Sequence, residues 1–141
     1  MPRKTTDYIV VHCSATKPSM DIGKKEIDRW HRERGFFKIG YHFVIRRDGT
    51  LETGRDLMDA GAHVQGINDR SIGICMVGGV SEHDVNTAEN NFTQAQFAAL
   101  VTLLKQMKTK FPKAAIKGHN EFAKKACPSF DVQAWLKTTL L

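Results

Sequence analysis

The stretch Tyr8-Ile-Val-Val-His-Cys13 predicts a buried β-strand around which the rest of the chain is organised. Its residues are mostly β-branched and almost continuously apolar, a composition typical of a strand that is covered on both faces. Because side chains alternate along a strand, His12 lies on one face and Cys13 on the other. We therefore expect that the side chains of His12 and Cys13 do not serve one site from within this strand.

Beyond this strand, predicted strands and helices alternate along the chain. The predicted strands are β-branched or aromatic runs bounded by turn signals, and they cover 8–13, 41–47, 50–53, 71–77 and 115–119. The predicted helices have recognisable start or stop residues, and they cover 21–34, the stretch from Thr93 to just before Pro112, and a stretch that starts at Asp131. The region 54–70 is polar and rich in glycine, so we expect a loop with a short strand.

Local signals mark the joints between these elements. Asp48-Gly49 separates two strand-like runs, which is a strong hairpin signal. Thr93 and Gln96 form a capping box, so the clearest helix begins there. The alternation with one hairpin predicts an α/β fold, in which a single domain over residues 1–141 has a central mixed β-sheet flanked by helices.

The length and composition exclude several classes of protein. A chain of 141 residues has the size of one domain and can bury a substantial core. Its 41% hydrophobic content excludes disordered and fibrous classes. No apolar run approaches the ~20 residues that a membrane span needs, and the basic start MPRKTTDYIVVHCSAT lacks the apolar core of a signal peptide. We expect a monomer without a membrane span or a leader.

The cysteines indicate the redox compartment, and the net charge indicates the class of partner. Three cysteines, Cys13, Cys75 and Cys127, do not make a disulfide framework and fit synthesis in a reducing cytoplasm. The net charge of +6 favours an acidic partner, whether nucleic acid, anionic lipid or a polymer that carries carboxylates. Scattered solvated charges are the simpler interpretation. Since no nucleic-acid-binding signature accompanies them, no specific nucleic-acid partner is expected.

His119 and Cys127 form the pattern that most suggests a metal site. A His at the end of a strand and a Cys in the following loop can converge on one ion, and imidazole with thiolate suits Zn²⁺. The spacing is not a standard zinc-finger spacing, and a surface His with a buried free Cys is the alternative. His12 is a candidate third ligand, although a hydrogen-bonded core histidine is the commoner state of such a residue. Two His and one Cys would leave one open position, which is typical of catalytic zinc.

Six motifs then occur in order along the chain: Val11-His-Cys-Ser-Ala-Thr-Lys-Pro18, Gly40-Tyr-His-Phe43, Arg47-Asp-Gly-Thr50, Ser71-Ile-Gly-Ile74, Val77-Gly-Gly79 and Lys125-Ala-Cys-Pro-Ser-Phe-Asp131. Together they closely resemble the phage lysozymes that are zinc N-acetylmuramoyl-L-alanine amidases. These enzymes belong to the type 2 amidase family, which shares its fold with the peptidoglycan-recognition proteins. The resemblance covers nearly the whole chain. It implies hydrolysis of the amide bond between N-acetylmuramic acid and L-alanine in peptidoglycan.

The resemblance also implies a role for five residues. The zinc ligands of the family match His12, His119 and Cys127, with water completing the coordination of one Zn²⁺ ion. The active-site tyrosine matches Tyr41, which would hydrogen-bond the attacking water or the leaving group. The catalytic lysine matches Lys125, which would place a positive charge beside the developing oxyanion.

The residues alone favour simpler interpretations for part of this set. Without the resemblance, Tyr41 would be assigned to strand packing, and Lys125 would be one more exposed lysine beside Lys124. His63, in the glycine-rich loop, is expected to line the substrate cleft and to contact the glycan or the stem peptide. Asn120 replaces a histidine of the family that is not a ligand, so we expect no consequence from it.

The remaining histidines and cysteines are expected to lie outside the site. His31 is assigned to packing on a helix face, and His42 to the side of its strand that faces away from the zinc. His83 falls in a polar loop. Cys13 and Cys75 are assigned to the core as free thiols.

Two other functions compete with the zinc amidase. A non-catalytic peptidoglycan binder is disfavoured, because such proteins typically lack the ligand that Cys127 supplies. Phage amidases of this kind also inhibit a phage RNA polymerase, partly through their N-terminal segment. Here only residues 1–7 precede the first strand, so that role stays an alternative. As an endolysin without a signal peptide, the protein would accumulate in the host cytoplasm and reach the cell wall after a holin opens the membrane.

Overall fold

A mixed five-stranded sheet forms the centre of the computed structural model, which describes residues 1–139. The strands are β1 (Tyr8–Cys13), β2 (Phe43–Ile45), β3 (Leu51–Thr53), β4 (Ser71–Met76) and β5 (Ala115–Gly118). They lie in the order β3-β2-β4-β1-β5. β1 runs parallel to β4 and β5, β2 runs parallel to β4, and β3 is antiparallel to β2. The predicted α/β architecture with a central mixed sheet is confirmed.

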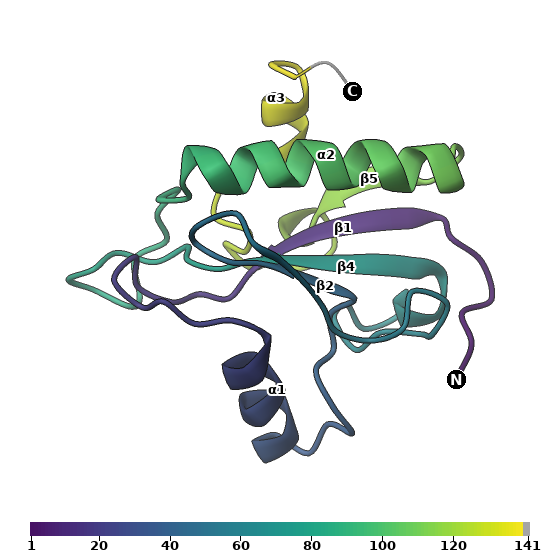
Figure 1. Cartoon of the computed structure of the whole chain (residues 1–141), viewed down its shortest axis with the longest axis horizontal. Coiled ribbons are helices and arrows are strands. Elements are labelled where there is room, and N and C mark those ends of the chain that lie inside the picture. The colour runs from purple at the N-terminus through teal and green to yellow at the C-terminus, as the bar shows by residue number, and fades with distance from the viewer. Residues whose placement is uncertain (140–141) are drawn as a thin grey trace.

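Helices cover both faces of this sheet (Figure 1). α2 (Gln94–Lys110) runs along one face, and α1 (Lys24–Glu33) lies on the opposite side. α3 (Val132–Leu136) packs on the same side as α2, where the ring of Trp135 lies 5.6 Å from that of Phe97. None of the helices within residues 1–139 combines the length and the apolarity that a membrane span requires.

β1 is buried on both faces, as its composition predicts. Ile9 and Val11 are fully buried in the core that α2 covers. Val10 is fully buried on the other face, against Val64. His12 shares the face of Val10 by alternation. Burial of the strand therefore fixes the side of the sheet on which the His12 imidazole lies.

The helix boundaries show how local signals set the chain direction. Thr93 Oγ1 accepts a hydrogen bond from the Gln96 N–H at 3.0 Å, and the Gln96 side chain accepts one from the Thr93 N–H at 2.9 Å, so the predicted capping box is confirmed. α1 begins at Lys24, later than the predicted residue 21. Gly23 is extended and its N–H donates to the Glu26 carboxylate at 2.8 Å, which caps the helix there.

Three further predicted segments differ from the structure. β2 is shorter than the predicted 41–47, because Tyr41 precedes the strand and Arg47 already lies in the hairpin turn. β5 ends at Gly118, so His119 begins a short 3-10 helix. Residues 54–70 contain a 3-10 turn, Asn68–Arg70, in place of the predicted short strand.

Candidate active site

The carboxyl ends of β1 and β5 bring two histidines together. The two strands are parallel neighbours with Val11 opposite Gly118, so the residues that follow, His12 and His119, meet at one edge of the sheet. Their ring centroids are 4.6 Å apart. Cys127, in the loop after β5, completes a group whose ligand atoms all lie within 4.8 Å of one another. The structure thus brings together the three residues that the sequence singled out as zinc ligands.

Contacts with β1 orient the sulfur of Cys127. The backbone N–H of Cys13 donates to this sulfur at 3.1 Å, and Nδ1 of His12 lies 3.9 Å from it. The side chain of Cys13 lies against Ser129, with 3.7 Å between Sγ and Oγ. β1 therefore supplies the site with the imidazole of His12 and the backbone of Cys13. All three cysteines of the chain are free thiols, as the sequence predicts.

The donor chemistry of this group fits a zinc ion. Nδ1 of His119 is buried without a hydrogen-bond partner in the described part of the chain, a costly state for a polar atom that an ion would relieve. Burial lowers the pKa of His12 and of His119, and the charge of Lys125 lowers both pKa values further. Both imidazoles are therefore neutral and have a lone pair to share. Two imidazoles and a thiolate suit Zn²⁺ and leave a fourth position open.

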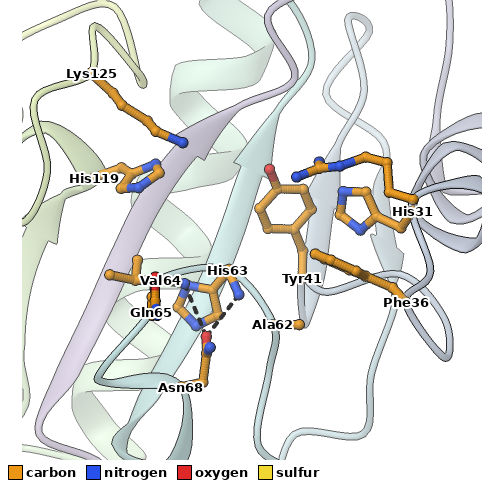
Figure 2. A pocket seen from close by; sticks show the side chains of 11 residues that line it. His31, Phe36, Tyr41, Ala62, His63, Val64, Gln65, Asn68, His119 and Lys125 are labelled. Atoms are coloured by element: carbon orange, nitrogen blue, oxygen red, sulfur yellow. Dashed lines mark hydrogen bonds between the residues drawn. The ribbon is translucent and has the colours of Figure 1, made fainter.

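A cavity of about 500 Å³ has His119, one of the three ligand candidates, in its lining (Figure 2). Figure 2 shows His119 and Lys125 on one side of it, Tyr41 on the other side, and His63 between them at the bottom. No Asp or Glu occurs among the described residues that line the cavity, whereas Arg34 and Lys125 contribute positive charge. The cavity is therefore suited to a ligand that carries carboxylates.

Tyr41 and Lys125 both border this cavity, as the resemblance implies. The ring of Tyr41 lies 5.0 Å from that of His12. Burial raises the pKa of Tyr41 well above its usual value, so the phenol keeps its proton and can donate a hydrogen bond at neutral pH. Lys125 is exposed, and its side chain extends over the cavity next to His119 (Figure 2). The neighbouring Lys124 does not line the cavity.

His63 lines the cavity, but both of its ring nitrogens are engaged inside the protein. Nδ1 lies 2.8 Å from Nε2 of His12, and Nε2 lies 3.1 Å from Oγ of Ser71. Burial lowers the pKa of His63 to about 3, so the ring is neutral. Its backbone N–H donates to Oδ1 of Asn68 at 2.7 Å, one of the dashed contacts in Figure 2. The ring is thus tied to a ligand candidate and presents no free nitrogen to a substrate.

His31 is a cavity residue that the sequence did not reveal. Its buried ring accepts the Gly40 N–H at Nδ1 over 2.9 Å, which fits the predicted packing role, and it also borders the cavity. His42 lies outside the ligand group, because its Nε2–H donates to the Asp59 carbonyl at 2.7 Å and its Nδ1 accepts the Gly73 N–H at 3.0 Å. The place of His42 outside the ligand group was expected, whereas the cavity contact of His31 depends on the loop around His63, which is distant in the sequence.

Comparisons of the sequence with known proteins agree with this geometry. The chain matches the Amidase_2 family, described as N-acetylmuramoyl-L-alanine amidase, over residues 2–130. It is 50% identical over 133 residues to the endolysin of Escherichia phage T7, which covers 94% of this chain and 87% of that endolysin. It is also 50% identical over 136 residues to the endolysin of Enterobacteria phage K11, with coverage of 96% and 89%.

Solved structures show the same likeness. The N-acetylmuramoyl-L-alanine amidase LysC from Clostridium intestinale superposes with a TM-score of 0.80 at 30% identity, covering 95% of this chain and 84% of that chain. Bumblebee PGRP-SA superposes with a TM-score of 0.78 at 22% identity, covering 99% and 89%. At this lower identity the likeness shows a shared fold.

Proposed function

Since this chain belongs to the N-acetylmuramoyl-L-alanine amidase family, we propose that it cleaves peptidoglycan with a zinc ion held by His12, His119 and Cys127. The bond cut joins the lactyl group of N-acetylmuramic acid to L-alanine. One observation carries the zinc assignment: three ligand atoms from distant parts of the chain converge within 4.8 Å, and among them His119 Nδ1 is buried without another partner in the described chain.

The residues around this group supply the rest of the chemistry. When bound, zinc would polarise the scissile carbonyl and lower the pKa of a water molecule. Tyr41, beside His12, keeps its phenolic proton and can donate a hydrogen bond to a group bound in the cavity. Lys125 places its ammonium beside the carbonyl oxygen as that oxygen gains negative charge. Water or the leaving group is the partner that we assign to Tyr41.

The charge of the cavity supports peptidoglycan as the substrate. Stem peptides carry carboxylates, and the described cavity lining contains Arg34 and Lys125 but no acidic side chain. The net charge of +6 adds a favourable long-range field. We assign His63 to the substrate-binding wall through the exposed part of its ring, because its nitrogens are engaged with other residues.

We place this activity in host-cell lysis, because two endolysins are 50% identical to the chain. The protein would accumulate in the host cytoplasm and reach the wall after a holin opens the membrane. It would act as a monomer, since all the ligand and catalytic candidates come from one chain. Inhibition of a phage RNA polymerase stays a prediction from the resemblance.

Mass spectrometry of purified peptidoglycan tests which bond is cut. After digestion with the zinc-loaded protein, we expect stem peptides with a free L-alanine amino group alongside intact glycan strands. Products cut within the glycan, or within the stem peptide, would refute the proposal.

Ligand variants test the metal assignment separately. Cys127→Ser and His119→Ala should lose zinc and activity together, because each removes one of three ligands. His83→Ala is the matched control, since His83 is exposed in a loop away from the cavity and its variant should keep both. Zinc per protein is measured by atomic emission after gel filtration. Ligand variants that keep both zinc and activity would contradict the assignment.

A further inference from the structure

A chain of three hydrogen bonds runs from His12 into the protein, on the side away from Cys127. His12 Nε2 lies 2.8 Å from His63 Nδ1, and His63 Nε2 lies 3.1 Å from Ser71 Oγ. Ser71 Oγ lies in turn 2.7 Å from the carbonyl oxygen of Ile67. His12 and Ser71 are 1% and 0% exposed, so water does not compete for these contacts.

The Ile67 carbonyl, the last group in this series of hydrogen bonds, fixes which atom donates in each of the others. The Ile67 carbonyl can only accept, so the Ser71 hydroxyl donates to it. The Ser71 oxygen then accepts from His63 Nε2–H. A neutral imidazole has one N–H, so Nδ1 of His63 is bare and accepts from His12 Nε2–H. This leaves Nδ1 of His12 without a proton.

Nδ1 is also the ring nitrogen of His12 that faces the ligand group, 3.9 Å from the sulfur of Cys127. We propose that His63 and Ser71 are positioning residues, which hold His12 in the tautomer whose bare Nδ1 faces the metal ion. The inference rests on the proposed function for the identity of the ion, whereas the direction of the hydrogen bonds follows from the Ile67 carbonyl and from the single N–H of a neutral His63 ring.

Two glycines leave the space that the His63 ring occupies. A Cβ at Gly73 would lie 2.7 to 2.9 Å from three atoms of the ring, and a Cβ at Gly61 would lie 2.6 Å from its Cδ2. Any side chain at either position would displace the imidazole. The Ser71-Ile-Gly-Ile74 motif therefore supplies both the hydroxyl that His63 contacts and the space in which its ring lies.

A hydrogen-bond partner on the second nitrogen of a ligating histidine has a measurable effect on metal affinity. A ligating histidine usually donates its second N–H to a carboxylate or a carbonyl, and loss of that partner lowers metal affinity by about 10- to 100-fold. In this protein a neutral imidazole takes the place of the carboxylate. It keeps the second contact of His12 uncharged, in a cavity whose described lining has no acidic residue.

Zinc affinity, measured by competition with a chelator, tests the role of His63. His63→Leu removes the acceptor and should weaken zinc binding by up to about 100-fold. His63→Asn places an amide oxygen near the position of Nδ1, so its affinity should stay within about threefold of the unsubstituted protein. Ser71→Ala removes the acceptor that holds the proton of His63 on Nε2, and it should lower zinc affinity by about 10-fold. Far-UV circular dichroism checks the fold, and Ser71→Ala keeps the test open if His63→Leu does not fold.

Nitrogen NMR of histidine-labelled protein reads the tautomers directly. We expect the proton on Nε2 of both His12 and His63, in the zinc-free and the zinc-loaded protein. A His63 that carries its proton on Nδ1 would overturn the inference, because that nitrogen could then not accept from His12.

The measurements also separate this inference from the amidase proposal. If His63 only lined the substrate cavity, Leu and Asn at this position would both lower kcat/KM and leave zinc affinity unchanged, which would refute the positioning role. A protein that binds zinc and shows the expected tautomers, but leaves the muramoyl-alanine bond intact, would refute the proposed function and leave the positioning role standing.

Discussion

Gly73→Ala should break the contact between His63 and His12 without a substitution at either histidine. The added methyl would lie 2.7 to 2.9 Å from three atoms of the His63 ring, whereas ordinary contacts are 3.4 to 4 Å. The ring must therefore move by roughly 0.5 to 1 Å, which is enough to disrupt its 2.8 Å contact with His12. A buried donor left without an acceptor costs about 1–3 kcal/mol, and overpacking costs about 1–3 kcal/mol more.

Urea unfolding of the zinc-free protein measures this cost. We expect the free energy of unfolding to fall by about 2–6 kcal/mol in Gly73→Ala. In a His63→Ala background the same substitution should cost less than about 1 kcal/mol, since the three atoms nearest to the added methyl all belong to His63. Equal costs in the two backgrounds would refute the reasoning.

Two further predictions concern catalysis and acid stability. Lys125→Ala should keep zinc and lose roughly 10²-fold in kcat/KM, the scale of an oxyanion donor. Lys124→Ala, one residue away and outside the cavity lining, should change neither zinc binding nor kcat/KM. A Lys125→Ala enzyme of normal rate would remove the lysine from the mechanism. Burial lowers the pKa of His42 to about 4, so the unfolded chain binds a proton there below about pH 6.5 and the folded chain does not. The contribution of His42 to stability is therefore complete above pH 6.5 and falls by about 3 kcal/mol towards pH 4. Urea unfolding of His42→Gln should show a shallower loss of stability over this range, and a loss parallel to that of the unsubstituted protein would contradict the assignment.

The strands and helix starts could be predicted because their signals are local. The buried strand Tyr8–Cys13 follows from its β-branched composition, and the start of α2 follows from the side chains of Thr93 and Gln96. Boundaries that depend on distant residues were less accurate. β2 covers only the three residues that pair with β3, and the N–H of Lys24, the first residue of α1, donates to the carboxylate of Glu52 at 2.8 Å.

The site itself was only partly accessible from the sequence. His119 and Cys127 are close enough along the chain to suggest a shared ion, whereas His12 joins them through the register of two parallel strands. For Tyr41 and Lys125 the residues alone favoured packing and solvent exposure, and only the resemblance suggested the roles that we propose for them.

The glycine-rich loop was the least predictable part of the site. Residues 54–70 lack any periodicity, so neither the hydrogen bonds of His63 nor those of Asn68 could be assigned from the sequence. The Ser71-Ile-Gly-Ile74 motif predicted a strand, but it did not indicate that Ser71 contacts His63 or that Gly73 leaves space for the His63 ring.

The separation of the three ligand candidates along the chain has a consequence during synthesis. His12 leaves the ribosome first, and Cys127 follows 115 residues later. At about 5–20 residues per second, roughly ten seconds pass between the two. A nascent chain can pair β1 with β4 during this interval, but it cannot complete the ligand group. The growing polypeptide therefore carries no assembled ligand group until its C-terminal loop has been translated.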